Sequence, residues 1–346
     1  MADIEIIDLK KTYTGGKTAF ENFNLTINGG EFVVLLGPTG AGKTAVLRTL
    51  CGLDDVTDGD IKLMGESIKT CQPKDRDMAV LFRSIGLYPY LNVYDNLAFG
   101  LKMRKMPRAA IEERVYFVSK LLGIGGLLGK KPKALSALER ARVSIGRAVI
   151  RQSKLILMDD PFSGFDANLK SQLINDVLKV QQRLKVNVIL STKDAAEALT
   201  LADRIVYMED GKIIQVGTPE EVYTSPATVA EALYIGSPKI NLIEGKIESN
   251  DGKNEFVFAG GRLLTDKPAC ERCYLAVRPE NVTIGGEFAA TATLKEQLAE
   301  DRYLLEISFA DGGKPYLMLS NTLTEGEVKV SFDSSLFFDA ATELRL

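Results

Sequence analysis

The sequence has 346 residues, enough for two or three domains, and its 45% hydrophobic and 26% charged composition is typical of a soluble globular protein. Its formal net charge of −3 provides no positive field for nucleic acid, so we exclude nucleic-acid partners. The chain shows no secretory signal and no apolar run near the roughly 20 residues of a membrane-spanning helix. We therefore expect a cytoplasmic protein that reaches a membrane only through a partner.

The first two thirds of the chain alternate short apolar runs with helical patterns, which predicts a doubly wound α/β core. Runs typical of buried parallel strands are Phe32–Leu36, Leu155–Met158, Val186–Leu190 and Ile205–Met208. Helices are predicted at Lys43–Cys51, Ala167–Lys185 and Ala195–Ala202. The pair Asp210-Gly211 predicts a hairpin turn. Between Asn92 and Ile150 the pattern is mainly helical, which indicates a helical subdomain over about 88–150.

After about residue 235 short alternating segments are separated by Gly, Asn and Asp, which predicts a small all-β domain of barrel or sandwich type. We therefore place the domains at 1–234 and 235–346. Within the second domain, Cys270 and Cys273 form one C-x-x-C pair, which is half a zinc site, and the sequence has no histidine to complete it. We interpret the pair as ordinary thiols beside a strand, and their role stays open.

The segment GPTGAGKT fits the phosphate-loop pattern G-x-x-x-x-G-K-[ST], and it lies between a predicted strand and a predicted helix. Its glycines let backbone N–H groups turn toward phosphate oxygens, and the helix N-terminus favours an anion. Lys43 would reach the β and γ phosphates, and Thr44 would be a Mg²⁺ ligand. The ATP-binding residues predicted from this segment are Gly37, Pro38, Thr39, Gly40, Ala41, Gly42, Lys43 and Thr44.

A carboxylate at the end of a buried strand beside a phosphate loop typically holds the metal ion. Asp159, in LILMDD, has this position and is the predicted second Mg²⁺ ligand. Taken without the phosphate loop, the same residue could also be a helix N-cap.

Several further segments resemble one family along the whole chain, the ATPase subunits of ABC transporters, and within it those of carbohydrate importers of the maltose and glycerol-phosphate type. They are LFRSIGLYPYLNVYDNLAFGLK, LSALERARVSIGRAVIR, LILMDDPFSGFD, STKDAAEALTLADRIVYMEDGKIIQVGTPEEVY, SPKINLIEG and VRPENV. The resemblance implies a P-loop NTPase core of RecA type with an inserted helical subdomain. It also implies that the C-terminal β domain is an OB-like regulatory domain.

The resemblance also implies roles for individual residues. Tyr13 would stack on adenine, and Asp166 would belong to the loop after the metal-binding strand. The signature loop, which faces the ATP of a partner subunit, corresponds to Leu135, Ser136, Ala137, Leu138 and Glu139. The stretch Tyr88–Gly100 would line a groove for a cytoplasmic helix of a membrane permease, with Tyr88, Tyr90, Tyr94 and Phe99 as its aromatic residues. A solute-binding protein would be an indirect partner.

The chain departs from the family pattern at the residues that hydrolyse ATP. Arg83 replaces a glutamine, Asp160 a catalytic glutamate and Lys193 a histidine, and LSALE replaces LSGGQ. Arginine offers donors only, so Arg83 can neither accept from water nor approach Mg²⁺. A shorter carboxylate shifts the base, and about 1 Å of misplacement can cost on the order of 100-fold in rate. Glu139 adds a charge that repels a polyphosphate.

Because the phosphate loop and Asp159 are intact, we predict a chain that binds ATP and Mg²⁺ but hydrolyses ATP weakly, paired with a sister ATPase that has intact motifs. Two alternatives stay open. One is a self-sufficient homodimeric transport ATPase that uses Asp160 and Lys193. The other is a regulatory ATP-binding protein without a role in transport.

Overall fold

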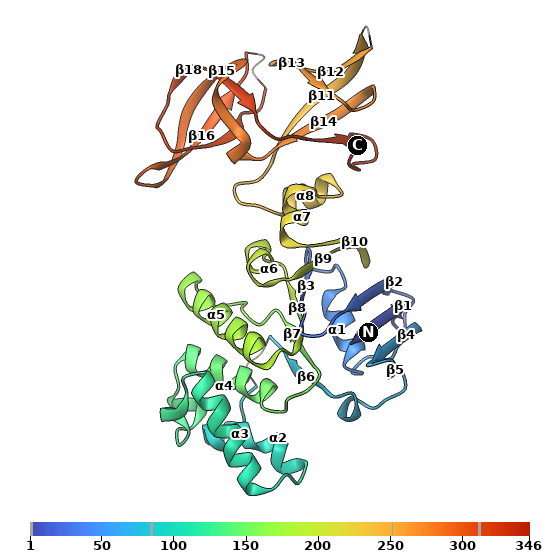
Figure 1. Cartoon of the computed structure of the whole chain (residues 1–346), viewed down its shortest axis with the longest axis vertical. Coiled ribbons are helices and arrows are strands. Elements are labelled where there is room, and N and C mark those ends of the chain that lie inside the picture. The colour runs from blue at the N-terminus through green and yellow to red at the C-terminus, as the bar shows by residue number, and fades with distance from the viewer. Residues whose placement is uncertain (1–2, 84–85, 251, 311–312) are drawn as a thin grey trace. The chain divides into compact units, whose positions relative to one another are not determined.

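The computed structural model describes residues 3–83, 86–250, 252–310 and 313–346 (Figure 1). The chain forms two compact units, Met1–Pro219 and Glu220–Leu346, which are described separately below. The predicted domain boundary after residue 234 assigns two short helices to the first domain. These helices, α7 (Pro219–Thr224) and α8 (Val229–Tyr234), lie almost entirely within the second unit by contacts. The two compact units divide after Pro219, and the domain boundary after residue 234 stays a prediction.

A six-stranded sheet is the centre of the first unit, with the strand order β10-β9-β3-β8-β7-β6. All of its strands are parallel except β10, which pairs with β9 as the predicted hairpin. The strands are β3 (Phe32–Leu36), β6 (Met78–Leu81), β7 (Leu155–Asp159), β8 (Asn187–Thr192), β9 (Arg204–Glu209) and β10 (Lys212–Gly217). Strands β3 and β8 are buried at every residue, as expected for apolar runs covered on both faces. The predicted α/β core is thus confirmed.

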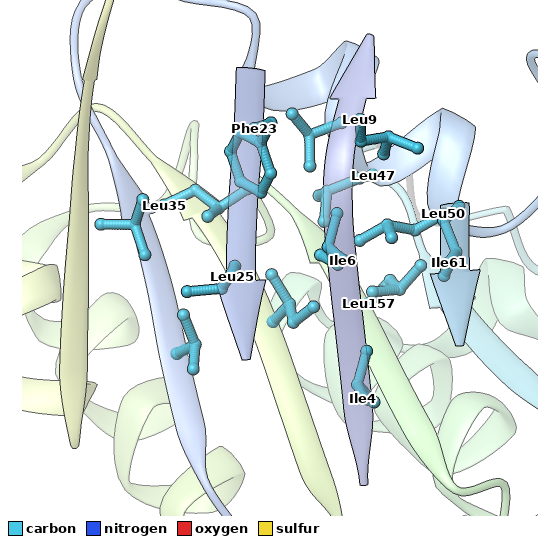
Figure 2. Packing of buried hydrophobic residues seen from close by; sticks show 14 of the residues in the cluster. Ile4, Ile6, Leu9, Phe23, Leu25, Leu35, Leu47, Leu50, Ile61 and Leu157 are labelled. Carbon is cyan, nitrogen blue, oxygen red and sulfur yellow. The ribbon is translucent and has the colours of Figure 1, made fainter. Parts of the chain in front are cut away.

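A second sheet in this unit is antiparallel, with the order β2-β1-β4-β5, and the sequence analysis did not identify it. Its strands are β1 (Ile4–Thr12), β2 (Thr18–Ile27), β4 (Asp58–Leu63) and β5 (Glu66–Ser67). Figure 2 shows apolar side chains of β1, β2 and β4, among them Phe23 and Ile61, gathered with Leu35 of β3, Leu47 of α1 and Leu157 of β7. Full burial of such a side chain stabilises by about 1.5 to 3 kcal/mol. This shared core fixes the antiparallel sheet against the parallel sheet.

The helices of the first unit are α1 (Lys43–Leu50), α2 (Val93–Met103), α3 (Arg108–Leu121), α4 (Ala137–Val149), α5 (Ala167–Leu184) and α6 (Ala195–Leu201). Short 3₁₀ turns occupy Pro73–Asp75, Gly125–Leu127 and Pro132–Ala134. Helices α2, α3 and α4 pack on one another and form a separate group in Figure 1. Gly146 of α4 lies close to α2, since a Cβ there would be 2.8 Å from the end of the Leu97 side chain, which would have to shift. The mainly helical insertion predicted between Asn92 and Ile150 is present.

The second unit is mostly β-structure, as predicted. One sheet has the order β13-β12-β11-β14-β19 and the other β17-β16-β15-β18. Their strands are β11 (Asn241–Asn250), β12 (Lys253–Phe258), β13 (Gly261–Thr265), β14 (Cys270–Val277), β15 (Val282–Ala299), β16 (Arg302–Ser308), β17 (Tyr316–Ser320), β18 (Gly326–Phe332) and β19 (Leu336–Asp339). A 3₁₀ turn, Pro279–Asn281, joins β14 to β15. The two sheets share one apolar core that includes Phe256, Phe288 and Leu305.

Helix α8 packs on this β-structure through a smaller apolar cluster that contains Val229, Ala232 and Phe338. The second unit therefore has a hydrophobic core of its own. Among the residues that the structure describes, no helix is long and apolar enough to cross a membrane.

Candidate nucleotide-binding site

The loop between β3 and α1 has a backbone that requires glycine at two points. Gly37 has a φ of +152°, and a Cβ at this residue would lie 2.1 Å from the carbonyl oxygen of Met208. Gly42 has a φ of +93°, and its Cβ would lie 2.6 Å from the carbonyl oxygen of Ala19. Such distances exclude any side chain, so the loop can close tightly only with glycine at both positions. The result is a narrow backbone turn that opens directly into the N-terminus of α1, where anions are favoured.

Lys43, the first residue of α1, folds back over this loop. Its ammonium group donates to the carbonyl oxygens of Gly37 and Pro38 at 2.6 Å and 2.7 Å. Burial lowers the pKa of Lys43, the nearby carboxylates of Asp160 and Asp159 oppose this, and the positive charge of Lys193 lowers it further. These four side chains therefore form one electrostatic group around the loop.

Asp159, at the end of β7, is held by two hydroxyl groups. Thr44 Oγ1 donates to Asp159 Oδ1 at 2.9 Å, and Ser191 Oγ donates to the same oxygen at 2.6 Å. The hydroxyl and the carboxylate are hard oxygen ligands, which are the kind that Mg²⁺ prefers. Their close approach beside the phosphate loop fits a magnesium ion bound together with nucleotide phosphates, with Thr44 and Asp159 as its ligands. The sequence prediction for these two residues is compatible with this geometry.

Sequence reasoning missed Ser191, although its position carried a signal. Strands β7 and β8 are parallel neighbours, and Asp159 is directly opposite Ser191 in their register. The carboxyl ends of parallel strands meet at one edge of a sheet, so a hydroxyl residue ending the next strand was a candidate partner. The sheet order that makes β8 the neighbour of β7 was needed to find it.

A cavity of about 650 Å³ extends from the phosphate loop. Five residues of the loop and of the first turn of α1 line it: Thr39, Gly40, Gly42, Lys43 and Thr44. Gly37 and Pro38 instead accept hydrogen bonds from Lys43 through their carbonyl groups. Ala41 is buried. Lys17, Arg48, Asp210 and Gly211, which sequence reasoning did not select, line the cavity as well.

Tyr13 lines the same cavity and has 42% of its surface exposed. Its hydroxyl donates to Asp54 Oδ2 at 3.3 Å, and Arg48 binds both oxygens of Asp54 at 3.0 Å. Partial burial and Asp54 raise the pKa of Tyr13, so the phenol stays neutral. The exposed part of the ring is compatible with stacking on a planar base, and the stacking of Tyr13 on adenine stays a prediction.

The three residues that the sequence analysis predicts to replace catalytic ones lie in this cavity. Arg83, Asp160 and Lys193 all line it, next to Asp159 and Lys43. Arg83 Nε is 3.7 Å from Asp160 Oδ2 and forms an ion pair with it. The backbone N–H of Asp160 donates to the carbonyl of Ser191 at 2.9 Å, and Asp160 has a φ of +47°. Asp is one of the few residues besides glycine that adopt this left-handed backbone readily.

The residues of the signature loop have a different environment. The described lining of the cavity includes none of Leu135–Glu139. Ser136 is the N-cap of α4, its Oγ accepts from the N–H of Glu139 at 3.2 Å, and Glu139 Oε2 accepts from the N–H of Ser136 at 2.7 Å. These backbone and side-chain bonds to Ser136 lower the pKa of Glu139. The pattern S-A-L-E was readable as a capping box, which the sequence analysis overlooked.

Asp166 is an N-cap as well. Its Oδ1 accepts from the N–H of Leu169 at 2.9 Å and begins helix α5. That Asp166 and the signature loop face a partner subunit stays a prediction.

The region predicted to contact a permease contains a groove of about 1090 Å³. Tyr88 and Phe99 line it, with ring centroids 4.6 Å apart, and the guanidinium of Arg147 lies 4.4 Å from the Tyr88 ring. Tyr90 is 88% exposed, and Tyr94 lines a different hollow beside α3. Of the four aromatic residues selected from the sequence, two therefore line the groove. Buried Asn96 holds the loop before α2 by bonding both backbone groups of Tyr88.

Together, the phosphate loop, the carboxylate at the end of the neighbouring strand and the adjoining cavity define a P-loop nucleotide-binding protein. A family model described as ABC transporter matches residues 20–163. The oligosaccharides import ATP-binding protein MsmX of Bacillus subtilis (strain 168) is 45% identical and is matched over 100% of both chains. The sn-glycerol-3-phosphate import ATP-binding protein UgpC of Rhodopseudomonas palustris (strain BisB18) is 39% identical, over 87% of this chain and 80% of the relative.

Among solved structures, cbiO1 from Clostridium perfringens, part of the ABC transporter complex cbiONQ, has a TM-score of 0.61 and 26% identity. The match covers 65% of this chain and 91% of the cbiO1 chain. The chain therefore belongs to the ATP-binding proteins of ABC transporters, a family of ATPases that bind ATP with Mg²⁺.

Proposed function

We propose that this chain is the ATP-binding subunit of an ABC importer for a sugar, a polyol or a glycerol-phosphate-like solute, and that it hydrolyses ATP weakly or not at all in its own site. The solute class follows from the named roles of its relatives. The impairment is supported by one observation: Arg83, Asp160 and Lys193, which we predict to stand at the catalytic positions, line the same cavity as Lys43, Thr44 and Asp159, which keep the residue types expected for binding nucleotide and metal.

The geometry around Asp160 supports this impairment. A general base must accept a proton from the attacking water within hydrogen-bond reach. In this chain the Asp160 carboxylate forms an ion pair with Arg83, a group that can only donate hydrogen bonds. Lys193 adds a second positive charge where the family has a histidine that can both donate and accept. No side chain at these positions combines the acceptor and donor roles that orient a water molecule for attack.

We further propose that this chain pairs head-to-tail with a sister ATPase. In a homodimer, both sites would combine Arg83, Asp160 and Lys193 with an LSALE loop. The side chains of Ala137 and Leu138 would add bulk where glycines allow close approach to a partner's ATP. A sister with intact motifs would provide at least one working set of catalytic residues. Turnover would then occur mainly at the nucleotide held by the sister.

The groove between α2, α4 and β6 is the proposed contact with the permease, which would place the chain on the inner face of the cell membrane. Its lining carries Lys74, Arg104, Arg147 and Arg151, and Asp75 is the one acidic residue among the described lining residues. Burial lowers the pKa of Arg151, and the charge of Arg104 lowers it further. A groove with this excess of positive charge favours a cytoplasmic helix that presents both apolar and acidic side chains.

Mg·ATP turnover by the purified chain, measured together with nucleotide retention after gel filtration, tests the proposal. We expect tight retention of ATP with turnover close to background. The variant Asp160→Asn should leave this low rate unchanged, because the carboxylate performs little catalysis in this chain.

Clear turnover by the chain alone that Asp160→Asn abolishes would contradict impaired hydrolysis and would support a self-sufficient homodimer. Co-purification with membrane subunits tests the transport role separately. Tight ATP binding with no association with any permease would instead favour a regulatory ATP-binding protein.

A further inference from the structure

The two cysteines of strand β14, Cys270 and Cys273, lie on the same face of their sheet. In a regular strand, residues three apart point to opposite faces, because side chains alternate. Here, however, Cys273 is opposite Gly245 of β11, whereas Cys270 is opposite Ile247. Three steps along β14 therefore match two steps along β11, which is a β-bulge with one extra residue in β14. Since opposite residues share a face and Gly245 and Ile247 are two apart, the bulge brings both cysteines to one face.

The packing of the two side chains agrees with this register. Cys273 is buried in the apolar core of the second unit, and Cys270, which is partly buried, packs against the same core. Two residues of β11 span about 6.5 Å, so we expect the Cα atoms of the cysteines to be separated by about this distance, against about 10 Å in a regular strand. Disulfides usually join Cα atoms about 4.4 to 6.8 Å apart. The bulge therefore brings the two cysteines within reach of a disulfide.

The two thiols differ in their access to solvent. Cys270 Sγ donates to the carbonyl oxygen of Arg272 at 3.3 Å and to Asp339 Oδ2 at 3.7 Å. Burial, the charge of Cys270 and a hydrogen bond between the two thiols together raise the pKa of Cys273 to about 12. Cys273 therefore stays protonated at neutral pH inside the core. Cys270, which is only partly buried, is the thiol that a small oxidant reaches first.

We propose that Cys270 and Cys273 form a peroxide-oxidation site that closes a reversible disulfide within the chain. The sulfur of Cys270 attacks one oxygen of hydrogen peroxide, the O–O bond breaks, and a sulfenic acid and one water molecule form. The sulfur of Cys273 then attacks the sulfenic sulfur, and the hydroxide leaves with the proton of Cys273 as a second water molecule. Two thiols are thus oxidised by two electrons, and one peroxide is reduced to two water molecules. A small dithiol restores both cysteines by disulfide exchange.

The rest of the structure tolerates this bond. The hydrogen bonds that Cys270 loses on oxidation come from a weak S–H donor. The disulfide encloses only Glu271 and Arg272, and so short a loop removes little entropy from the unfolded chain. Both cysteines belong to the second compact unit, Glu220–Leu346, so the inference is independent of the proposed function.

Peptide mapping of the full-length chain after treatment with hydrogen peroxide tests the site. Trypsin cleaves after Arg272, between the two cysteines, so a disulfide would hold together two peptides that separate on reduction. We expect this linked pair in the oxidised chain, and we expect dithiothreitol to release both peptides with free thiols. Dimedone, which traps sulfenic acids, should label Cys270 of the unmodified chain only weakly, because Cys273 consumes the sulfenic acid.

Two single variants serve as matched controls. In Cys273→Ser the sulfenic acid on Cys270 has no second thiol to react with, so labelling of Cys270 by dimedone should increase by about 10-fold or more. In Cys270→Ser the remaining thiol is buried and protonated, so peroxide should oxidise Cys273 about 10-fold or more slowly than it oxidises Cys270.

The proposal is overturned if peroxide converts Cys270 of the unmodified chain to a sulfenic or sulfinic acid and no linked peptides form. A disulfide between two chains, seen as a dimer on a non-reducing gel, would overturn it as well. So would two unmodified cysteines under conditions that oxidise free cysteine. Nucleotide retention by the same oxidised sample reports separately on the proposed function.

Discussion

At the scale of single residues, Glu139 has a local role in the structure, whereas its role toward a partner subunit stays a prediction. Its replacement of glutamine was interpreted from the sequence as a charge facing the ATP of a partner subunit. In the structure its carboxylate accepts from the backbone of Ser136 and completes a capping box for α4. Because the box satisfies backbone donors at the helix N-terminus, the residues before α4 have a defined conformation within this chain alone.

We predict that Ser136→Ala lowers the free energy of unfolding of the first unit by about 1 kcal/mol, because the N–H of Glu139 loses its acceptor. Glu139→Gln is the matched control, since glutamine can also accept from the backbone N–H of Ser136, and it should have the smaller effect. Urea unfolding at neutral pH measures both variants. A larger loss in Glu139→Gln than in Ser136→Ala would mean that the carboxylate charge contributes more to α4 than the hydroxyl acceptor does.

Sequence reasoning at this scale could bring residues together where a motif fixes both residue type and spacing, although their roles toward ATP and Mg²⁺ stay predictions. Lys43, Thr44 and Asp159 lie where the motif predicts, because the loop and the strand end leave them little freedom. It failed for Ser191, which belongs to no motif and approaches Asp159 only through the sheet order. The ion pair of Arg83 with Asp160 was also out of reach, because 77 residues separate the two partners.

At the scale of elements, helices α5 and α6 are joined by one partly exposed lysine. Lys170 of α5 binds Asp194, the N-cap of α6, and Glu197 in its first turn, whose side chain is only 3% exposed. Burial acts against the charge of Lys170, but the two carboxylates raise its pKa to about 12. Burial likewise opposes ionisation of Asp194, yet the bond to Lys170 lowers the pKa of this carboxyl overall.

We predict that Lys170→Met destabilises the first unit by about 2 to 3 kcal/mol at pH 7, because it leaves the buried Glu197 without its cation, partly offset by the exposure of Lys170 and Asp194. A lowered folded-state pKa stabilises above the unfolded value of about 3.9 and loses this effect as pH falls through the folded value. The cost of the substitution should therefore shrink below about pH 4.

Urea unfolding at pH 7 and at pH 3 checks this dependence. Lys179→Met, on an exposed position of the same helix, is the control and should have little effect at either pH. A cost for Lys170→Met that is the same at both pH values would show that packing of the lysine stem, and not its charge, joins the helices.

A helix or strand could be predicted from the sequence where its hydrophobic pattern is regular. Strands β3, β7, β8 and β9 were found because they are continuous apolar runs. Strand β1 was missed because its alternation is broken: Asp8 has a φ of +44°, and the register to β2 shifts after Ile6. A bulge of this kind moves side chains to the other face, so periodicity no longer marks the strand.

At the scale of the whole molecule, each compact unit has its own apolar core, and every residue that lines the nucleotide cavity belongs to the first unit. We therefore predict two thermal unfolding transitions by scanning calorimetry. ATP should raise the midpoint of only one, since a ligand at 100 times its Kd stabilises the unit that binds it by about 2.7 kcal/mol. A shift of both transitions by the same amount would mean that the two units unfold as one cooperative block.

The bonds from Lys43 to the carbonyls of Gly37 and Pro38 have a consequence for the heat of nucleotide binding. To reach a phosphate, the ammonium must exchange two carbonyl acceptors for phosphate oxygens, so the number of its hydrogen bonds changes little. Its contribution is then mainly the attraction of opposite charges, which dissolved salt weakens and which releases little enthalpy of its own. The contribution of Lys43 to the affinity for phosphate therefore depends more on the ionic strength of the solution than on new hydrogen bonds.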